Sequence, residues 1–191
     1  MIQGRALVGA AVVGCLALPV ARQALERAMI VHMLVQIPAL AVAGALMGSA
    51  LPARWMARLR EWNAGGLTGI LLALIASSWW MLPRALDGAL SDPWMETAKF
   101  VSLPFFVGLP TALSWPELSF IGRGFVVVNV LPMWAVVGWL YIVAPTRLCN
   151  FYLADQQVTA GVGLLCASIG AALAFGALSF RSVQPSTARP G

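Results

Sequence analysis

Long apolar runs separated by short polar connections fill most of the chain. There are six of them, at 6–22, 29–51, 65–83, 98–115, 124–144 and 158–180. Each is close to the roughly 20 residues that a helix needs to cross a bilayer core of about 30 Å. The runs are continuous and do not alternate with polar residues, so they predict transmembrane helices and not the strands of an outer-membrane barrel.

The pattern therefore predicts an all-α fold, a polytopic transmembrane helical bundle of about six spans. One transmembrane domain takes up residues 1–180, and a flexible cytoplasmic tail is expected at 181–191. Composition agrees, because 60% of the 191 residues are hydrophobic and 10% are charged. Arg22 and Arg27 follow the first run without a small-x-small cleavage site, which favours a retained helix over a cleaved signal.

Charges in the connections predict the orientation. The N-terminus, the 52–64 and 116–123 loops and the tail carry seven basic and two acidic residues, whereas the other side carries five of each. Short loops rich in arginine and lysine stay in the cytoplasm. We therefore expect a multi-pass protein of the bacterial inner membrane with both termini cytoplasmic. The basic charge is explained by contact with the lipid bilayer and does not indicate a nucleic-acid partner.

The start of the second run holds the only histidine of the chain. On a helix, His32 shares a face with Met29, Met33 and Gln36. Thioether and imidazole groups together suit Cu(I), a soft cation. Two plainer interpretations stay open, because methionine fills gaps in helical bundles and a lone histidine can bond a neighbouring helix. Met81, beside Pro83 at the end of the third run, adds another soft ligand on the same side.

Polar residues also stand out in the last two runs. Pro132 frees backbone groups within the fifth run, and Asn129 can bond them or a neighbouring helix. Asp155 or Gln156 can cap the start of the sixth run. Two glycine pairs with GxxxG spacing, Gly44/Gly48 and Gly65/Gly69, predict close helix packing. The three cysteines have neither metal-site nor disulfide spacing.

Several of these segments resemble one family of membrane proteins, the CtaG-type cytochrome c oxidase assembly factors. The resemblance covers about residues 28–165. Its most specific part is the run Tyr152-Leu-Ala-Asp155-Gln156-Gln157, preceded by Leu131-Pro132-Met133 and Gly138-Trp-Leu-Tyr141; weaker parts are His32-Met33-Leu34, Trp80-Met-Leu-Pro83 and Asp92-Pro93. It implies a respiratory-chain assembly factor that acts as a metallochaperone, handling Cu(I) at the periplasmic face for an oxidase subunit, and that is not an enzyme.

The chain departs from that family in its histidines. Met81, Glu96 and Phe100 stand where the family has outward-side histidines, and six spans replace an expected seven. The resemblance thus implies a divergent, histidine-poor member with copper as its cofactor. The expected ligands are His32 and Met33 first, then Met29 and Met81. The expected partner-contact or structural residues are Asp155, Gln156, Gln157, Tyr152, Asn129 and Pro132.

Two other functions remain open on sequence grounds. One is a non-catalytic structural or accessory subunit of a membrane respiratory or oxygenase complex, which the scarcity of histidine favours. The other is a small transporter. Transporters usually need charges inside the membrane or paired broken helices, and we expect almost no buried charge in these spans.

Overall fold

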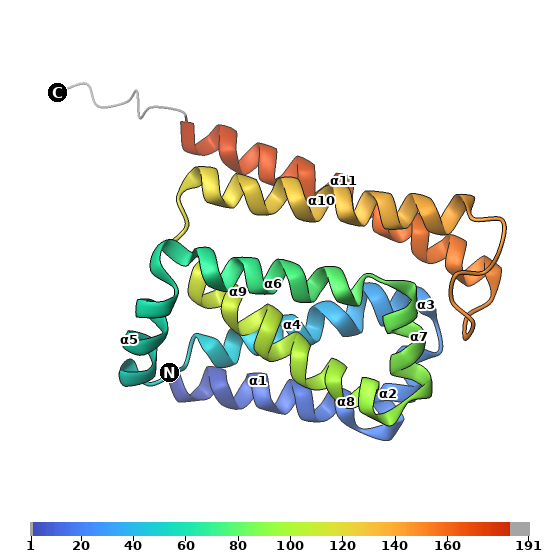
Figure 1. Ribbon diagram of the computed structural model, residues 1–191, viewed down its shortest axis with the longest axis horizontal. Helices are drawn as coiled ribbons and strands as arrows, with labels where there is room; N and C mark the ends of the chain where they lie inside the picture. The colour runs from blue at the N-terminus through green and yellow to red at the C-terminus, as the bar shows by residue number, and fades with distance from the viewer. Residues whose placement is uncertain (1, 184–191) are drawn as a thin grey trace.

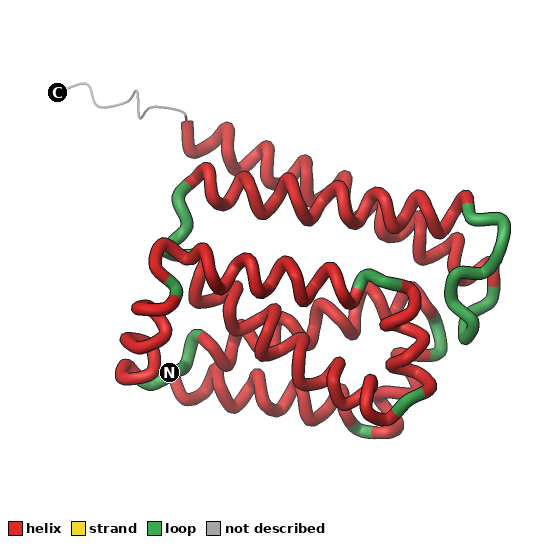
Figure 2. Tube along the Cα trace, in the orientation of Figure 1, coloured by secondary structure: helices red, strands yellow, loops and turns green. Residues whose placement is uncertain are grey.

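Every regular element in the computed structural model is a helix. The structure describes the backbone of residues 2–183 and the side chains of residues 4–180, and no strand occurs in that part of the chain. The all-α fold class is therefore confirmed, and Figure 2 shows how little of the chain lies in loops. Residues 184–191 of the expected tail lie outside the described residues.

The elements are α1 (Ile2–Ala17), α2 (Pro19–Glu26), α3 (Met29–Val31), the π-helical turn η1 (His32–Gln36), α4 (Ile37–Gly48), α5 (Ala53–Trp62), the 3₁₀ turn η2 (Ala64–Gly66), α6 (Leu67–Trp80), α7 (Pro83–Ser91), α8 (Pro93–Ser102), the π-helical turn η3 (Leu103–Gly108), α9 (Leu109–Ser114), α10 (Phe120–Val143) and α11 (Ala154–Val183).

The described residues contain three to five candidate membrane spans, which indicates a multi-pass membrane protein. Three helical stretches are long and apolar enough on their own: Met29–Gly48, Phe120–Val143 and Ala154–Phe180. Two more qualify if a helix pair bent by 72° counts as one span, namely α1 with α2 and the 64–80 stretch with α7. The remaining expected span, 98–115, is helical but is not among these candidates. Its sequence includes Lys99 and two prolines, which limits how apolar it is.

The long helices run along one direction, and the connections gather at the two ends. In Figure 1, α10 and α11 lie side by side along one edge of the bundle, and α6, α9, α4 and α1 follow below them. The N-terminus, α5 and the start of α10 lie at one end, whereas α2, α7 and the loop after α10 lie at the other. The loops counted as basic therefore do share an end. Which end faces the cytoplasm stays a prediction.

Prolines and polar caps explain where the short helices begin. Pro19, Pro83 and Pro93 each occupy the first position of a helix, where the missing N–H costs nothing. The Asp92 carboxylate accepts a hydrogen bond from the Trp94 backbone N–H at 3.0 Å and so caps α8. Ser119 caps α10 in the same way through the Gly122 N–H, at 3.2 Å. These starts produce the bends that separate α6, α7 and α8.

Close backbone contacts hold α4 against the turn η3. A Cβ atom placed on Gly44 would lie 2.0 Å from the Pro104 carbonyl oxygen, and one on Gly48 would lie 3.2 Å from a side-chain carbon of Leu109. The Gly44/Gly48 pair therefore packs helices closely, as its spacing predicted. The second pair is divided. Gly65 has φ +63° and lies in the turn before α6, with open space around its Cα, so its role is conformational. Gly69 packs closely as predicted, since a Cβ atom there would overlap the Ser114 hydroxyl of α9.

We expect Gly44→Ala to destabilise the bundle. Its new methyl group would overlap the Pro104 carbonyl, so α4 and η3 would have to move apart, at a cost of about 1–3 kcal/mol for such overpacking. Thermal unfolding of the detergent-solubilised protein measures this. Gly170→Ala on α11 is the matched control, since nothing lies within 4 Å of the added atom. Equal midpoints for the two variants would contradict the close contact.

Candidate functional site

A buried ammonium group lies at the end of the bundle that holds α2 and α7. Lys99 of α8 has no exposed surface. Its Nζ donates to Glu26 Oε1 at 2.5 Å, to His32 Nε2 at 3.3 Å and to Gln36 Oε1 at 3.4 Å. All three of its N–H donors thus have acceptors. A carboxylate, an imidazole and an amide from α2 and η1 surround one cation from α8.

Tyr152 completes this cluster from the loop between α10 and α11. Its hydroxyl donates to the Glu26 backbone carbonyl at 2.9 Å, so its oxygen is left to accept from His32 Nδ1, also at 2.9 Å. Burial raises the pKa of Tyr152 well above its ordinary value, which keeps the phenol proton in place for that donation. We call Glu26, His32, Gln36, Lys99 and Tyr152 the Lys99 cluster.

The bonding pattern assigns a tautomer to His32. If Nδ1 carries the proton that goes to Tyr152, then the lone pair lies on Nε2 and faces the Lys99 ammonium. Both ring nitrogens therefore have partners, and the side chain is fully buried. A metal ion could bind His32 only if Lys99 moved away.

A second ion pair joins the same two helices beside the Lys99 cluster. Arg22 of α2 pairs with Glu96 of α8, and its Nε lies 3.8 Å from Glu26 Oε2. The four charged groups, two of each sign, sum to zero. Helices α2 and α8 are far apart in sequence. The ion pairs between them therefore hold together the two ends of the long segment that connects these helices.

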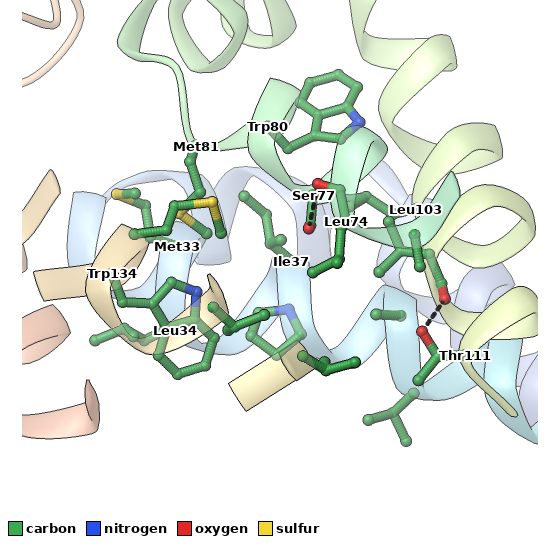
Figure 3. A pocket seen from close by; sticks show the side chains of 18 of the residues that line it. Met33, Leu34, Ile37, Leu74, Ser77, Trp80, Met81, Leu103, Thr111 and Trp134 are labelled. Atoms are coloured by element: carbon green, nitrogen blue, oxygen red, sulfur yellow. Dashed lines mark hydrogen bonds between the residues drawn. The ribbon is translucent and has the colours of Figure 1, made fainter. Parts of the chain in front are cut away.

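An apolar pocket of about 310 Å³ lies next to the cluster, deeper in the bundle. Its walls come from η1 and α4, from α6, from η3 and α9, from α10, and from one residue of α11. Three methionines line it, Met33, Met81 and Met133, together with Trp80 and Trp134. Figure 3 shows Met33, Met81 and Trp134 toward one end of the pocket and Thr111 toward the other.

The structure separates the four expected metal ligands into three places. Met33 and Met81 line the pocket, although they come from different helices. His32 belongs to the Lys99 cluster, and Met29 is buried in the core without lining the pocket. Among the described residues, no group of three histidine, cysteine, aspartate or glutamate side chains is placed to hold a metal ion. The soft donors that share one pocket are the methionine thioethers of Met33, Met81 and Met133.

The expected partner-contact and structural residues divide in a similar way. Tyr152 and Gln157 are buried, and Gln157 ties the loop down by accepting from the Leu148 N–H and donating to the Tyr141 carbonyl. Asp155 lies exposed in the first turn of α11 and Gln156 is half-buried beside it. No hydrogen bond from either side chain caps the helix, so the predicted cap is not formed there.

Asn129 and Pro132 lie on the outer surface of α10. The Asn129 side-chain amide donates to the Phe125 carbonyl of its own helix at 2.7 Å and does not reach a neighbouring one. Ser168 of α11 donates to the Leu131 carbonyl at 2.9 Å, next to Pro132. Two backbone carbonyls of α10 near the proline thus accept side-chain hydrogen bonds, one from α10 itself and one from the neighbouring α11.

Cys149 is a buried thiol in the loop that carries Tyr152. Its side chain has no exposed surface, and burial together with nearby Asp87 raises the pKa of its thiol to about 11. A thiol in that state is a packing group and a poor nucleophile at neutral pH. Asp87 fixes the loop from α7, because its Oδ2 accepts from the Asn150 backbone N–H at 2.7 Å.

The sequence did not single out Lys99 or Glu26 as site residues. The expectation of almost no buried charge is wrong at this cluster, where Lys99 is fully buried and Glu26 nearly so. One signal was present: Lys99 stands just inside the expected span 98–115, and a charge within a span points to a functional or structural site. Its partner could not be identified, because Glu26 lies 73 residues earlier.

Comparison with known proteins returns no match: no protein-family description, no curated protein and no solved structure matches this chain. What defines this protein is its all-α, multi-pass architecture, with a charged cluster and a methionine-lined pocket side by side.

We expect Glu26→Gln to destabilise the fold strongly. It leaves the Lys99 ammonium buried without its countercharge, and breaking a buried pair from one side typically costs about 3–5 kcal/mol. The double variant Glu26→Gln/Lys99→Met should recover much of that loss, since it removes both charges at similar volume. Thermal unfolding in detergent tests both variants. If the stability losses of Glu26→Gln and Lys99→Met, each measured alone, simply add up to the loss of the double variant, the pair is not coupled.

Proposed function

We propose that this chain is an assembly factor for a haem-copper oxidase that holds Cu(I) in its methionine-lined pocket. One observation carries the copper part: Met33 and Met81, two of the expected ligands, line a single pocket with Met133 as a third thioether. The oxidase part rests on the resemblance of residues 28–165 to CtaG-type assembly factors. A factor of this kind transfers a metal and catalyses no bond chemistry.

The donor set suits a soft monovalent ion. Thioethers prefer Cu(I) over harder metals such as Mg²⁺ or Ca²⁺, and they carry no charge that would need neutralising in an apolar wall. The rings of Trp80 and Trp134, which also line the pocket, can stabilise a cation through their faces. Copper bound there would be shielded from water and released to a partner membrane subunit. With both termini cytoplasmic, the adjoining Lys99 cluster lies toward the periplasm.

The copper site can be tested by retention of Cu(I) against a competing chelator. Met33→Leu, Met81→Leu and Met133→Leu should each weaken binding by about tenfold or more, because even outer-shell partners of metal ligands contribute that much. Leucine keeps the side-chain volume nearly unchanged, so the fold should survive. Metal content of the purified protein after loading and challenge gives the result.

Two variants serve as controls for that experiment. Met29→Leu changes a methionine that is fully buried but does not line the pocket, so it should retain wild-type affinity. His32→Asn should also bind normally, because His32 is engaged by Tyr152 and Lys99. Loss of copper in His32→Asn with normal binding in the pocket variants would move the site to the Lys99 cluster and reject the pocket.

A second candidate function is a metal-free accessory subunit of a membrane respiratory or oxygenase complex. The Lys99 ammonium favours it, since this cation lies 3.3 Å from the nitrogen that a metal would use on His32. Failure of the wild-type protein to retain copper, while oxidase maturation still depends on the chain, would select this function over the first.

Both candidates need a surface that contacts a partner, and Asp155 provides a test of it. Its exposed carboxylate makes no cap, so Asp155→Asn should leave thermal stability within about 1 kcal/mol, the size of a charge–dipole effect. We expect it to impair oxidase maturation in a host lacking the native chain, at normal protein level. Asp155→Ala is the companion variant. Full oxidase activity with both would remove Asp155 from the contact surface.

A further inference from the structure

The helix α5 stands apart from the bundle in both position and chemistry. In Figure 1 it runs across one end of the long helices, at the end opposite the Lys99 cluster. Only Met56 and Leu59 among its apolar side chains are half-buried, and they lie on the face turned to the rest of the protein. The remainder of the helix is exposed.

The exposed face of α5 combines arginines with tryptophans. At helical spacing, Arg54, Arg58 and Trp62 follow one another at intervals of four, and Trp55 lies beside them. The two indole rings are 49% and 81% exposed. The Arg58 guanidinium lies over the Trp55 ring, 6.0 Å from its centre. We call these four residues the α5 stripe.

The arginines of the α5 stripe lack carboxylate partners. Among the residues that the structure describes, no ion pair involves Arg54 or Arg58, whereas Arg60 on the opposite face pairs with Glu117 at 3.5 Å. Arg123, at the same end of the bundle, stacks on Trp115 and has no acid partner either. One acid, Glu61, lies at the edge of the stripe, three residues after Arg58.

We propose that the α5 stripe binds the headgroup of an anionic phospholipid. Exposed indole rings prefer the headgroup level of a bilayer, and arginines there bind lipid phosphate groups. A helix that crosses the end of a transmembrane bundle lies at that level. The guanidinium groups of Arg54 and Arg58 form no ion pair within the described part of the chain and lie four residues apart. They can therefore both bind the phosphate group of a lipid that packs beside the indole rings. This site is independent of the copper pocket and of the oxidase partner.

Lipid titration of the full-length detergent-solubilised protein, followed by native mass spectrometry, tests the site. The probes are phosphatidylglycerol and phosphatidylcholine. The wild type should bind the first phosphatidylglycerol more tightly than phosphatidylcholine. Arg54→Gln/Arg58→Gln should weaken that phosphatidylglycerol binding by about fivefold per arginine, the usual contribution of a basic residue near an anionic membrane surface, and should leave phosphatidylcholine unchanged.

Three further variants make the result decisive. Arg147→Gln removes an exposed arginine at the opposite end and should change nothing. Arg54→Lys/Arg58→Lys keeps the charge and should retain most of the preference. Glu61→Gln removes the repelling acid and should tighten phosphatidylglycerol binding. Unchanged binding in the double glutamine variant, equal loss in Arg147→Gln, or no gain in Glu61→Gln would each overturn the site.

Discussion

The fully buried ammonium of Lys99 is the constraint around which this fold is arranged. A charge removed from water is tolerated only when it is neutralised and all its donors are satisfied. Glu26 supplies the charge, and His32 and Gln36 supply the remaining acceptors. These groups come from α2 and η1, so α8 can occupy its place only when both earlier elements are already positioned. Tyr152 bonds to the same cluster, so the loop between α10 and α11 is attached there as well.

The π-helical turn η1 is a short segment whose side chains contact two different environments. Its residues His32 and Gln36 point to the Lys99 cluster, whereas Met33 between them lines the apolar pocket. π-Helical turns often occur where a helix must present side chains in directions that an α-helix does not allow. The polar cluster and the soft, uncharged pocket are therefore neighbours without being one site.

Apolar periodicity was enough to predict the all-α membrane architecture, because hydrophobic runs of this length have few other solutions. The same periodicity overstated the number of spans. It could not show that the chain bends by 72° between α1 and α2 and between α6 and α7. Spacing placed Met29, His32, Met33 and Gln36 on one face; all four are buried, but they contact two different environments. It could not show which partners these residues contact, because Lys99 and Tyr152 are separated from them by 63 residues or more.

The Lys99 cluster and the adjoining pocket impose opposite demands on a bound cation. In the Lys99 cluster the positive charge is built in and fixed by Glu26, so a further cation there would face an ammonium at close range. In the pocket the walls offer uncharged sulfur and aromatic faces and no competing charge. A transferable metal needs a site that can lose its ion without leaving an unpaired charge in an apolar medium, and thioethers meet that condition where carboxylates do not. In the proposed function, Cu(I) in the pocket would therefore meet no built-in charge, while the charged cluster joins η1, which forms part of the pocket wall, to α2 and α8.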